Sequence, residues 1–539
     1  MEAAQGPSPA TRAEVLNARL TARGAEVADD DAGDHHLRVT RYTGVNPPIA
    51  LTTNYHWPTR QDEMEGNYFY YSRSDNPNYL LLEKELTRLH HGSSAVVFAT
   101  GMAAISAVLL SLVRKDKAVV RANEIYNDVP RLLQEMTEMS GTQVITVDIC
   151  DTEAVIKSVE QENVRVLYFE SASNPNSFVP DFDELIRRTR EVNPQCLVVV
   201  DNTFLSPIHF RPLDHGADIV IESGTKYLSG KGDVLLGAVV FRKKQADQGD
   251  MVLTAITQRV KRWRSVGGGS PSPMSCWLVS KGLETLRLRM HHATATALEV
   301  ARFLETVPCL SRVVFPGLAS HPCHTRAVKY FGEKNSGAVL RFHICLYGPT
   351  VDQMLTDPHP FMHAVSLGES HTLLYPVPGE SRLFPEDAER EVPDYVGYWF
   401  RVAIGLETAE DIISGFLHEL VTKVGEVKKF DAKTRQLSFR GKLPSPCPYL
   451  FFFAGESDGG KGQKPPSQST DGQGTRRAIF IERVAGDEAG GGKAAKKGKA
   501  TVTLGLAAAA DEKALLTKGT ALFCFKSALT LYTELVGKK

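Results

Sequence analysis

The sequence predicts an α/β fold with a mostly parallel sheet, followed by a smaller α+β domain. Between about residues 80 and 245, short apolar runs alternate with helical stretches, an order typical of a parallel sheet covered by helices. These runs are rich in Val and Ile, and many are apolar throughout rather than alternating. Strands buried on both faces of a parallel sheet have this pattern.

The expected elements follow one another along the chain. Residues 101–113 predict a buried helix, and the strand-like runs are Ala118–Arg121, Gln143–Val147, Arg165–Phe169, Leu197–Val200, Ile219–Ile221 and Leu236–Phe241. After the Gly-rich break at Gly267–Pro273, we expect a long helix over 276–308, a strand over 337–346 and a final helix from Thr408 to about Lys423. Its start, Thr408-Ala-Glu-Asp411, has the form of a capping box.

Four regions follow from these elements. We expect an N-terminal arm over 1–48, a large domain over 49–270, a small C-terminal domain over 271–430 and a low-complexity tail over 431–539. Residues 454–499 are rich in Gly, Ser, Gln and Lys, a composition that predicts disorder. The stretch 513–536 is apolar enough for an amphipathic helix.

Composition excludes several classes of protein. The chain of 539 residues is longer than one core usually supports. Its net charge of −1 favours neither nucleic acid nor an anionic membrane, and no apolar run approaches the roughly 18 residues of a membrane span. The N-terminus has no signal-peptide pattern, so we expect a cytoplasmic location. The 8 cysteines form no C-x-x-C pair, which indicates no metal site and no disulfide framework.

The strongest chemical signal is Glu222-Ser-Gly-Thr-Lys-Tyr-Leu-Ser-Gly230, directly after an apolar strand. Ser223 and Thr225 can donate hydrogen bonds to a phosphate, and Gly224 allows the backbone to come close. A lysine shielded from water, here Lys226, has a lowered pKa and forms imines with aldehydes. A lysine among hydroxyl groups would otherwise be a solvated surface residue.

A carboxylate follows the preceding strand. Leu197-Val-Val-Val200 leads into Asp201, at the carboxyl end of a strand, where open α/β sheets bind ligands. An acid in this place can keep a pyridine nitrogen protonated and so make the ring an electron sink. Taken alone, Asp201 is as readily a turn or N-cap residue.

Two further segments suit an anion. Ala99-Thr-Gly-Met-Ala-Ala104 opens the first buried helix, and free backbone amides at a helix N-terminus bind phosphate. A glycine turn before a core helix is the competing interpretation. Tyr70-Tyr-Ser-Arg-Ser-Asp-Asn-Pro77 combines an arginine with phenol groups that can also contact an anion.

Together these motifs carry a resemblance. Y-S-R-x-x-N-P, T-G-M-A-A-I, E-S-x-x-N-P, V-V-V-D-N-T-F and S-x-T-K-Y-L-S-G occur in this order between about residues 45 and 425. The chain resembles the Cys/Met-metabolism enzymes that depend on pyridoxal 5′-phosphate (PLP), such as cystathionine γ-synthase, cystathionine γ-lyase and methionine γ-lyase. The resemblance implies the aspartate-aminotransferase-like fold (fold type I), PLP as cofactor and a homotetramer built from catalytic dimers.

The resemblance also implies roles for individual residues. Lys226 would hold PLP as a Schiff base, Asp201 would pair with the pyridine nitrogen, Asn174 would contact the ring hydroxyl, and Tyr126 would stack on the ring and serve as an acid–base group. Gly101, Met102, Ser223 and Thr225 would hold the phosphate, and Tyr71 and Arg73 would reach the phosphate of a neighbouring subunit. Ser366 and Arg401 would bind the substrate α-carboxylate, a task that suits the planar guanidinium of arginine.

The sequence departs from the family pattern in three places. Glu222 stands where the family usually has histidine, and Lys231 follows Gly230 where histidine is usual. Asn127 and Asp128 follow Tyr126, where the family has Gly-Gly or Gly-Cys. The last change lies at the expected substrate pocket, so it bears on substrate choice.

The resulting hypothesis is γ-elimination on a sulfur amino acid, giving a 2-oxo acid, ammonia and a thiol. Capture of the same intermediate by a thiol, as in cystathionine γ-synthase or homoserine-ester sulfhydrylases, is the alternative; an inactive PLP-fold scaffold is a remote one. Val365, where cystathionine-processing members carry glutamate, and Asn174-Pro-Asn176 favour methionine. Asp128 favours cystathionine instead, because a carboxylate can meet its distal ammonium.

Overall fold

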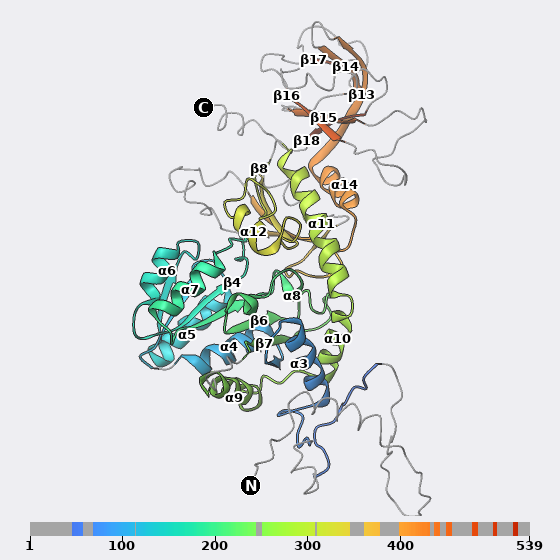
Figure 1. Cartoon of the computed structure of the whole chain (residues 1–539). Coiled ribbons are helices and arrows are strands. Elements are labelled where there is room, and N and C mark those ends of the chain that lie inside the picture. Colours follow the sequence, from blue (N-terminus) through green and yellow to red (C-terminus); the bar gives the residue numbers. More distant parts are fainter. Residues whose placement is uncertain are drawn as a thin grey trace, which may run out of the picture. The chain divides into compact units, whose positions relative to one another are not determined.

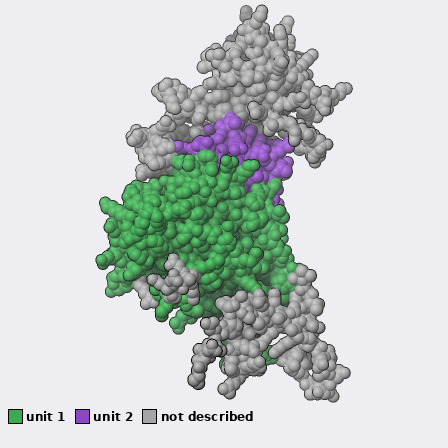
Figure 2. Space-filling view, in the orientation of Figure 1, with its two compact units in different colours: residues 1–292, 322–337 green, residues 293–321, 338–539 purple. Residues whose placement is uncertain are grey.

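The computed structural model describes residues 46–57, 68–113, 115–243, 251–307, 310–344, 361–377, 398–431, 436–441, 449–454, 477–482, 500–503 and 521–525. The chain divides into two compact units (Figure 2). Unit 1 comprises Met1–His292 and Pro322–Gly337, and unit 2 comprises Ala293–His321 and Ala338–Lys539. Unit 1 therefore extends beyond the expected domain boundary at residue 270, which stays a prediction.

Unit 1 is built on a seven-stranded sheet, of which Figure 1 labels β4, β6 and β7. The strand order is β1-β7-β6-β5-β4-β2-β3. The strands are β1 (Ser94–Phe98), β2 (Ala118–Ala122), β3 (Gln143–Val147), β4 (Val164–Glu170), β5 (Leu197–Asp201), β6 (Ile219–Ser223) and β7 (Gly237–Phe241). The pairs from β3 through β6 are parallel, and β7 runs antiparallel to both of its neighbours. The mostly parallel α/β sheet predicted from the apolar runs is confirmed.

Helices lie between successive strands from β1 to β6, as expected of an α/β domain, and further helices precede β1 and follow β7. They are α3 (Pro77–Leu89), α4 (Gly101–Leu112), α5 (Asp128–Ser140), α6 (Thr152–Val159), α7 (Phe182–Val192), α8 (Ser206–His209), the 3-10 helix η1 (Pro212–His215), α9 (Met251–Val266) and α10 (Pro273–Leu283). The expected long helix over 276–308 is wrong, because α10 ends at Leu283 and α11 (Leu286–Glu305) begins a new helix. The break follows Gly282, a poor helix former.

A short return segment of the chain completes unit 1. After residues 293–321, which belong to unit 2, the chain comes back to unit 1 and forms α12 (His324–Phe331). Aromatic rings anchor this helix: Tyr330 lies 5.1 Å from Phe182 and Phe331 lies 5.2 Å from Phe210, centroid to centroid. Lys329 Nζ adds an ion pair of 2.9 Å with Asp181.

Unit 2 contains a smaller sheet of five strands, in the order β10-β11-β12-β9-β8. These strands are β8 (Leu310–Val314), β9 (Val339–Ile344), β10 (Met362–His363), β11 (Leu373–Val377) and β12 (Tyr398–Ala403), and α14 (Ala409–Leu420) follows them. The expected strand over 337–346 is confirmed by β9. The last expected helix is confirmed too, although it ends at Leu420 and not at Lys423.

The C-terminal segment differs from its prediction. A six-stranded sheet, β16-β15-β18-β13-β14-β17, is formed by β13 (Val421–Asp431), β14 (Gln436–Gly441), β15 (Tyr449–Ala454), β16 (Arg477–Glu482), β17 (Ala500–Thr503) and β18 (Ala521–Phe525). Strand β18 lies within the stretch for which a helix is expected, and β16 lies within the stretch whose composition predicts disorder. The disordered tail as a whole stays a prediction. Runs such as Tyr-Leu-Phe-Phe-Phe have high strand propensity, which the average composition of the tail conceals. The segments between these strands lie outside the described residues.

None of the helices in the described ranges is long and apolar enough to cross a membrane.

Candidate active site

Three adjacent strands of unit 1 carry carboxyl groups near their carboxyl ends. Glu170 ends β4 and pairs in register with Asp201, which ends β5, and Glu222 is the next-to-last residue of β6. The three side chains are 6%, 8% and 1% exposed. Burial raises the pKa of each carboxyl, and the proximity of Asp201 raises the pKa of Glu170 and Glu222 further. Glu170 and Asp201 lie on the same face of the sheet, whereas Asp201 pairs with Ile221, so Glu222 lies on the opposite face. A cationic group is therefore favoured beside Glu170 and Asp201.

Asp201 is tied to the turn that carries Lys226. The backbone N–H of Thr203 donates to Oδ1 of Asp201 over 2.9 Å, and Oγ1 of Thr203 accepts from the N–H of Ser223 over 2.9 Å. The N–H of Lys226 then donates to the carbonyl of Ser223 over 3.1 Å. The structure thus brings together Asp201, Ser223 and Lys226, as the sequence predicts.

The lysine turn is held on its other side by Arg289. Gly230 has φ of +76°, and a Cβ there would lie 2.0 Å from Nη1 of Arg289. The same Nη1 donates to the carbonyl of Tyr227 over 2.7 Å. Because Gly230 N–H donates to the carbonyl of Lys226 over 2.9 Å, the backbone of the lysine is fixed at both ends of the turn.

The start of α4 lies against the same turn. Thr100 caps this helix through its side chain, which accepts from the N–H of Ala103, and the first amides of a helix have no intrahelical acceptor. A Cβ on Gly101 would lie 3.1 Å from Ser223 Oγ. A Cβ on Gly237 of β7 would lie 2.1 Å from the carbonyl oxygen of Thr100, so only glycine allows this approach.

Gly101 therefore lies beside Ser223, and Met102 follows it in the first turn of α4. The sequence assigns these three residues to the phosphate, and amides at a helix N-terminus suit an anion. The fourth expected phosphate ligand, Thr225, has a structural partner as well. Its Oγ1 accepts from the N–H of Leu236 over 3.0 Å.

Tyr126 and Asn174 are held by one carboxylate. The N–H of Tyr126 donates to Oε1 of Glu170 over 2.7 Å, and the N–H of Asn174 donates to Oε2 over 2.8 Å. Glu124 joins the same two loops, because it accepts from Ser173 Oγ over 2.8 Å and from Asn176 Nδ2 over 2.7 Å. These positioning acids were missed at the sequence level, although Glu170 follows an apolar strand as Asp201 does.

The phenol of Tyr126 contacts Asp128, one of the residues at which the sequence departs from the family pattern that its motifs resemble. Tyr126 Oη donates to Oδ2 of Asp128 over 3.0 Å, and Oδ1 of Asp128 lies 2.9 Å from Nη1 of Arg131. The Tyr126 side chain is 40% exposed. The tyrosine is thus open to small molecules, and its hydroxyl orientation is set by Asp128.

Glu222 contacts a histidine from elsewhere in the chain. Its Oε1 accepts from Asn202 Nδ2 over 3.0 Å and lies 3.5 Å from Nε2 of His90. Both side chains are buried. Burial lowers the pKa of His90 to about 3 and raises the pKa of Glu222, so the contact joins a neutral acid to a neutral imidazole. A histidine therefore lies beside this position after all, contributed by the C-cap of α3.

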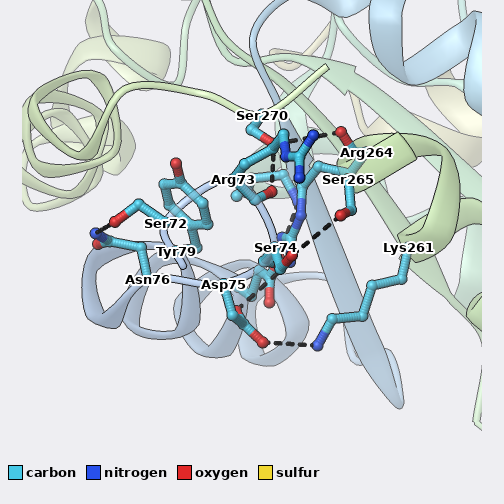
Figure 3. A network of polar contacts seen from close by, with 12 residues as sticks. Ser72, Arg73, Ser74, Asp75, Asn76, Tyr79, Lys261, Arg264, Ser265 and Ser270 are labelled. Atoms are coloured by element: carbon cyan, nitrogen blue, oxygen red, sulfur yellow. Dashed lines mark hydrogen bonds and ion pairs between the residues drawn. The ribbon is translucent and has the colours of Figure 1, made fainter. Parts of the chain in front are cut away.

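The Tyr70–Pro77 segment is fastened to α9 (Figure 3). Buried Arg264 donates to Glu83 Oε1 over 2.5 Å and to the carbonyl of Ser74 over 2.8 Å, while Lys261 Nζ lies 2.9 Å from Asp75 Oδ2. The side chain of Tyr71 is 43% exposed, and the guanidinium of Arg73 lies 5.4 Å from the centre of its ring. The structure thus holds the backbone of this motif while the tyrosine faces outward.

The expected carboxylate-binding residues lie in unit 2. Arg401, in β12, donates from Nη2 to the carbonyl of Ser366 over 3.0 Å, and its guanidinium lies 5.6 Å from the ring of Tyr375. Ser366 has φ of +96° and follows Val365, which is 64% exposed. Arg401 and Ser366 are therefore in contact, and their role in binding the substrate α-carboxylate stays a prediction.

The residues of unit 1 fit PLP. The amides that open α4 suit its phosphate, and the buried carboxyl of Asp201, whose pKa is raised by burial, gains from a protonated pyridine nitrogen. Lys226 supplies the amine for its aldehyde.

Comparison with known proteins agrees with this fit. Residues 33–421 match the model of the Cys/Met metabolism PLP-dependent enzyme family. An L-methionine γ-lyase of Treponema denticola is 31% identical over 69% of this chain and 92% of its own length, and a cystathionine β-lyase of Bacillus subtilis is 32% identical over 69% and 90%. The crystal structure of cystathionine γ-synthase from Xanthomonas oryzae in complex with aminoacrylate and cysteine superposes with a TM-score of 0.61, at 29% identity, over 77% of this chain and 98% of that chain. The chain belongs to the Cys/Met metabolism family of PLP-dependent enzymes, has its type I fold and takes PLP as cofactor.

Proposed function

We propose that this enzyme is a carbon–sulfur lyase that carries out γ-elimination on a sulfur amino acid, releasing a 2-oxo acid, ammonia and a thiol. The observation that carries the proposal is the Tyr126–Asp128 hydrogen bond of 3.0 Å, on a loop clamped to Asn174 through Glu170. Elimination needs an acid that protonates the departing sulfur, and a half-exposed phenol with a fixed hydroxyl suits this role.

The roles of the other residues follow from their positions. Bound PLP would supply an electron sink for charge that develops on the substrate carbons. Asp201 would face the pyridine nitrogen, Asn174 the ring hydroxyl, and Gly101, Met102, Ser223 and Thr225 the phosphate. The amine of Lys226, on a turn fixed at both ends, would take the proton from Cα and return protons along the substrate. General acid–base steps of this kind contribute roughly 10²- to 10⁴-fold each.

Substrate orientation is assigned to unit 2. Arg401 presents a planar guanidinium that matches a carboxylate with two hydrogen bonds, and its contact with the Ser366 carbonyl restricts its direction. The apolar residue Val365 is 64% exposed, and its side chain suits the methylthio end of methionine. Asp128 is the opposing feature, since a carboxylate suits the ammonium of cystathionine. We place methionine or homocysteine ahead of cystathionine.

Assembly and location complete the proposal. We infer a cytoplasmic homotetramer, a dimer of catalytic dimers, in which Tyr71 and Arg73 reach the cofactor phosphate of a neighbouring subunit. The outward-facing Tyr71, on a backbone segment fastened by Arg264, supports this arrangement. The partners are small amino-acid substrates.

γ-Replacement is the second candidate, because one similar structure is a cystathionine γ-synthase. An inactive scaffold is the remote alternative, and the presence of every expected cofactor-binding residue argues against it.

A product assay separates these functions. Purified enzyme is given methionine, cystathionine, homocysteine and O-acetylhomoserine, each with and without added thiol. Elimination predicts a 2-oxo acid and ammonia without added thiol. Products that form only when thiol is present would replace this proposal with γ-replacement, and the absence of turnover on all four would favour the scaffold.

A further inference from the structure

Two cysteines of unit 1 lie in contact although they are far apart in the sequence. Sγ of Cys150 lies 3.7 Å from Sγ of Cys323, across 173 positions. Cys150 follows β3 in a turn whose Asp148 accepts from the Cys150 N–H over 2.9 Å. Cys323 is the N-cap residue of α12. The other two cysteines of the described ranges whose environment is known, Cys196 and Cys276, are buried at separate places.

The surroundings of the pair favour a thiolate on Cys323. The hydrogen bond between the two sulfurs, together with the nearby Arg326, lowers the pKa of Cys323 to about 7. The same interaction, with burial, raises the pKa of Cys150. One proton is thus shared within the pair, which leaves one nucleophilic sulfur and one thiol beside it.

Access differs within the pair, because Cys323 is buried, as Cys196 and Cys276 are, whereas its neighbour Cys150 is not. Cys323 is 4% exposed, whereas Cys150 is only partly buried, so the contact lies close to the surface. A small oxidant can reach such a site, whereas a bulky disulfide reaches it less easily. A disulfide requires the sulfurs to approach to about 2.05 Å, and side chains that already face each other need only rotate toward one another.

We propose that Cys150 and Cys323 form a reversible redox pair, which a hydroperoxide converts into a disulfide that fastens α12 to the turn after β3.

The chemistry is balanced with one hydroperoxide. The Cys323 thiolate attacks the peroxide oxygen, the O–O bond breaks, and the sulfur becomes a sulfenic acid while the leaving oxygen takes a proton. The sulfur of Cys150 then attacks Cys323, the S–O bond breaks, and water departs with the proton of Cys150. The two thiols lose two electrons, the hydroperoxide gains them, and a dithiol reverses the step.

The bond would restrict a particular segment of the chain. Residues 322–337 belong to unit 1, but the chain on either side of them belongs to unit 2. The disulfide therefore fixes residues 322–337, the segment of unit 1 that is joined at both ends to segments of unit 2. Opening of α12 away from the rest of unit 1 would be suppressed in the oxidised form.

The test uses the full-length holoenzyme, reduced and then treated with hydrogen peroxide. We expect a mass loss of about 2 Da, a Cys150–Cys323 cross-linked peptide after digestion, and recovery of the original mass with dithiothreitol. Hydrogen exchange of the α12 amides should slow by about tenfold or more in the oxidised form. Cys150→Ser should abolish both changes, while the matched control Cys196→Ser should keep them.

Several outcomes would overturn the proposal. One is a gain of oxygen atoms without a cross-link in the wild type. Another is a disulfide that maps to other cysteines. A third is the same slowing of exchange in Cys150→Ser. Since the peptide map is made on the wild type, the proposal does not depend on whether either variant folds.

Discussion

The backbone N–H of Tyr126 donates to Oε1 of Glu170 across 44 positions of the chain. The second oxygen of Glu170 receives the N–H of Asn174, so one buried carboxylate sets the distance between two loops that we assign to the cofactor ring. Buried apolar residues, Ile125 in one loop and Ala172 in the other, hold each loop against unit 1, and Glu170 fixes their polar backbone groups relative to each other.

Glu170→Gln should lower kcat by about 10- to 100-fold, because an amide nitrogen cannot accept one of these two hydrogen bonds and a small displacement of a reacting group is costly. The visible spectrum of bound PLP should shift at the same time, since Tyr126 and Asn174 both move. Glu162→Gln, on an exposed loop, is the matched control. Unchanged kcat and spectrum in Glu170→Gln would remove this positioning role.

Lys226→Ala should abolish turnover while leaving some PLP bound without a covalent link. Borohydride treatment of the wild type should fix the cofactor to Lys226, which peptide mapping detects. Lys231→Ala, in the exposed stretch after the turn, should keep both activity and labelling. A label on any lysine other than Lys226 contradicts the assignment.

Much of this site follows from local patterns, and the rest depends on contacts that no local pattern contains. Lys226 and Asp201 are predictable because each follows a run of buried β-branched residues, and such strands end at the ligand-binding edge of a sheet. His90 is not predictable as the neighbour of Glu222, since 132 positions separate them (222 − 90). The ion pair of Arg264 with Glu83 cannot be predicted from the sequence either, because a charged residue in a helix usually faces water.

The tail shows a different limit of prediction. Its strands are short, rich in aromatic residues and separated by long polar stretches. A composition averaged over such a segment indicates disorder, whereas strand pairing depends on a few residues in each run.

Glu222→Gln should make the enzyme more stable relative to wild type as the pH rises. Burial raises the pKa of Glu222 in the folded state. The contribution of Glu222 to the free energy of unfolding is therefore fully present below its pKa in the unfolded chain, about 4.3, and is lost as the pH rises through its pKa in the folded protein. Glutamine has no such loss. The difference in free energy of unfolding should grow by up to about 1.4 kcal/mol per pH unit in that window.

Urea unfolding of both proteins between about pH 5 and 8 measures this difference. The pKa of His90 is lowered to about 3 in the folded protein. Below the pKa that His90 has in the unfolded chain, its contribution to the free energy of unfolding therefore rises with pH, opposite to that of Glu222. It is present in both proteins and cancels. A difference that stays flat or falls with pH would show that Glu222 is ionised in the folded state.

Hybrid enzymes should test the shared active site. Arg73→Ala and Lys226→Ala damage different parts of the site, so a mixed dimer should contain one intact site if Arg73 serves a neighbouring subunit. Mixing the two inactive variants should restore up to about a quarter of wild-type activity, by random pairing of equal amounts. Lack of recovery after proven subunit exchange would place Arg73 in the site of its own chain.

Asp128→Cys should change substrate preference through Tyr126. Loss of the carboxylate frees the phenol from its 3.0 Å hydrogen bond and removes a negative charge that suits an ammonium. We expect kcat/KM for cystathionine to fall by about tenfold or more relative to methionine. Asp128→Asn keeps the size and a hydrogen-bond acceptor and serves as the control. If the ratio of kcat/KM for cystathionine to kcat/KM for methionine is the same in the wild type and in Asp128→Cys, Asp128 has no part in specificity.

The return of residues 322–337 to unit 1 has a consequence for biosynthesis. The ribosome delivers Met1–His292 first, but the rings of Tyr330 and Phe331 that cover Phe182 and Phe210 come later. Until Gly337 has left the exit tunnel, the nascent unit 1 is therefore incomplete, and the rings of Phe182 and Phe210 stay without their contacts to Tyr330 and Phe331. During that interval these two rings are a natural binding place for a chaperone, and synonymous codons that slow translation between residues 293 and 337 should lower the yield of soluble enzyme.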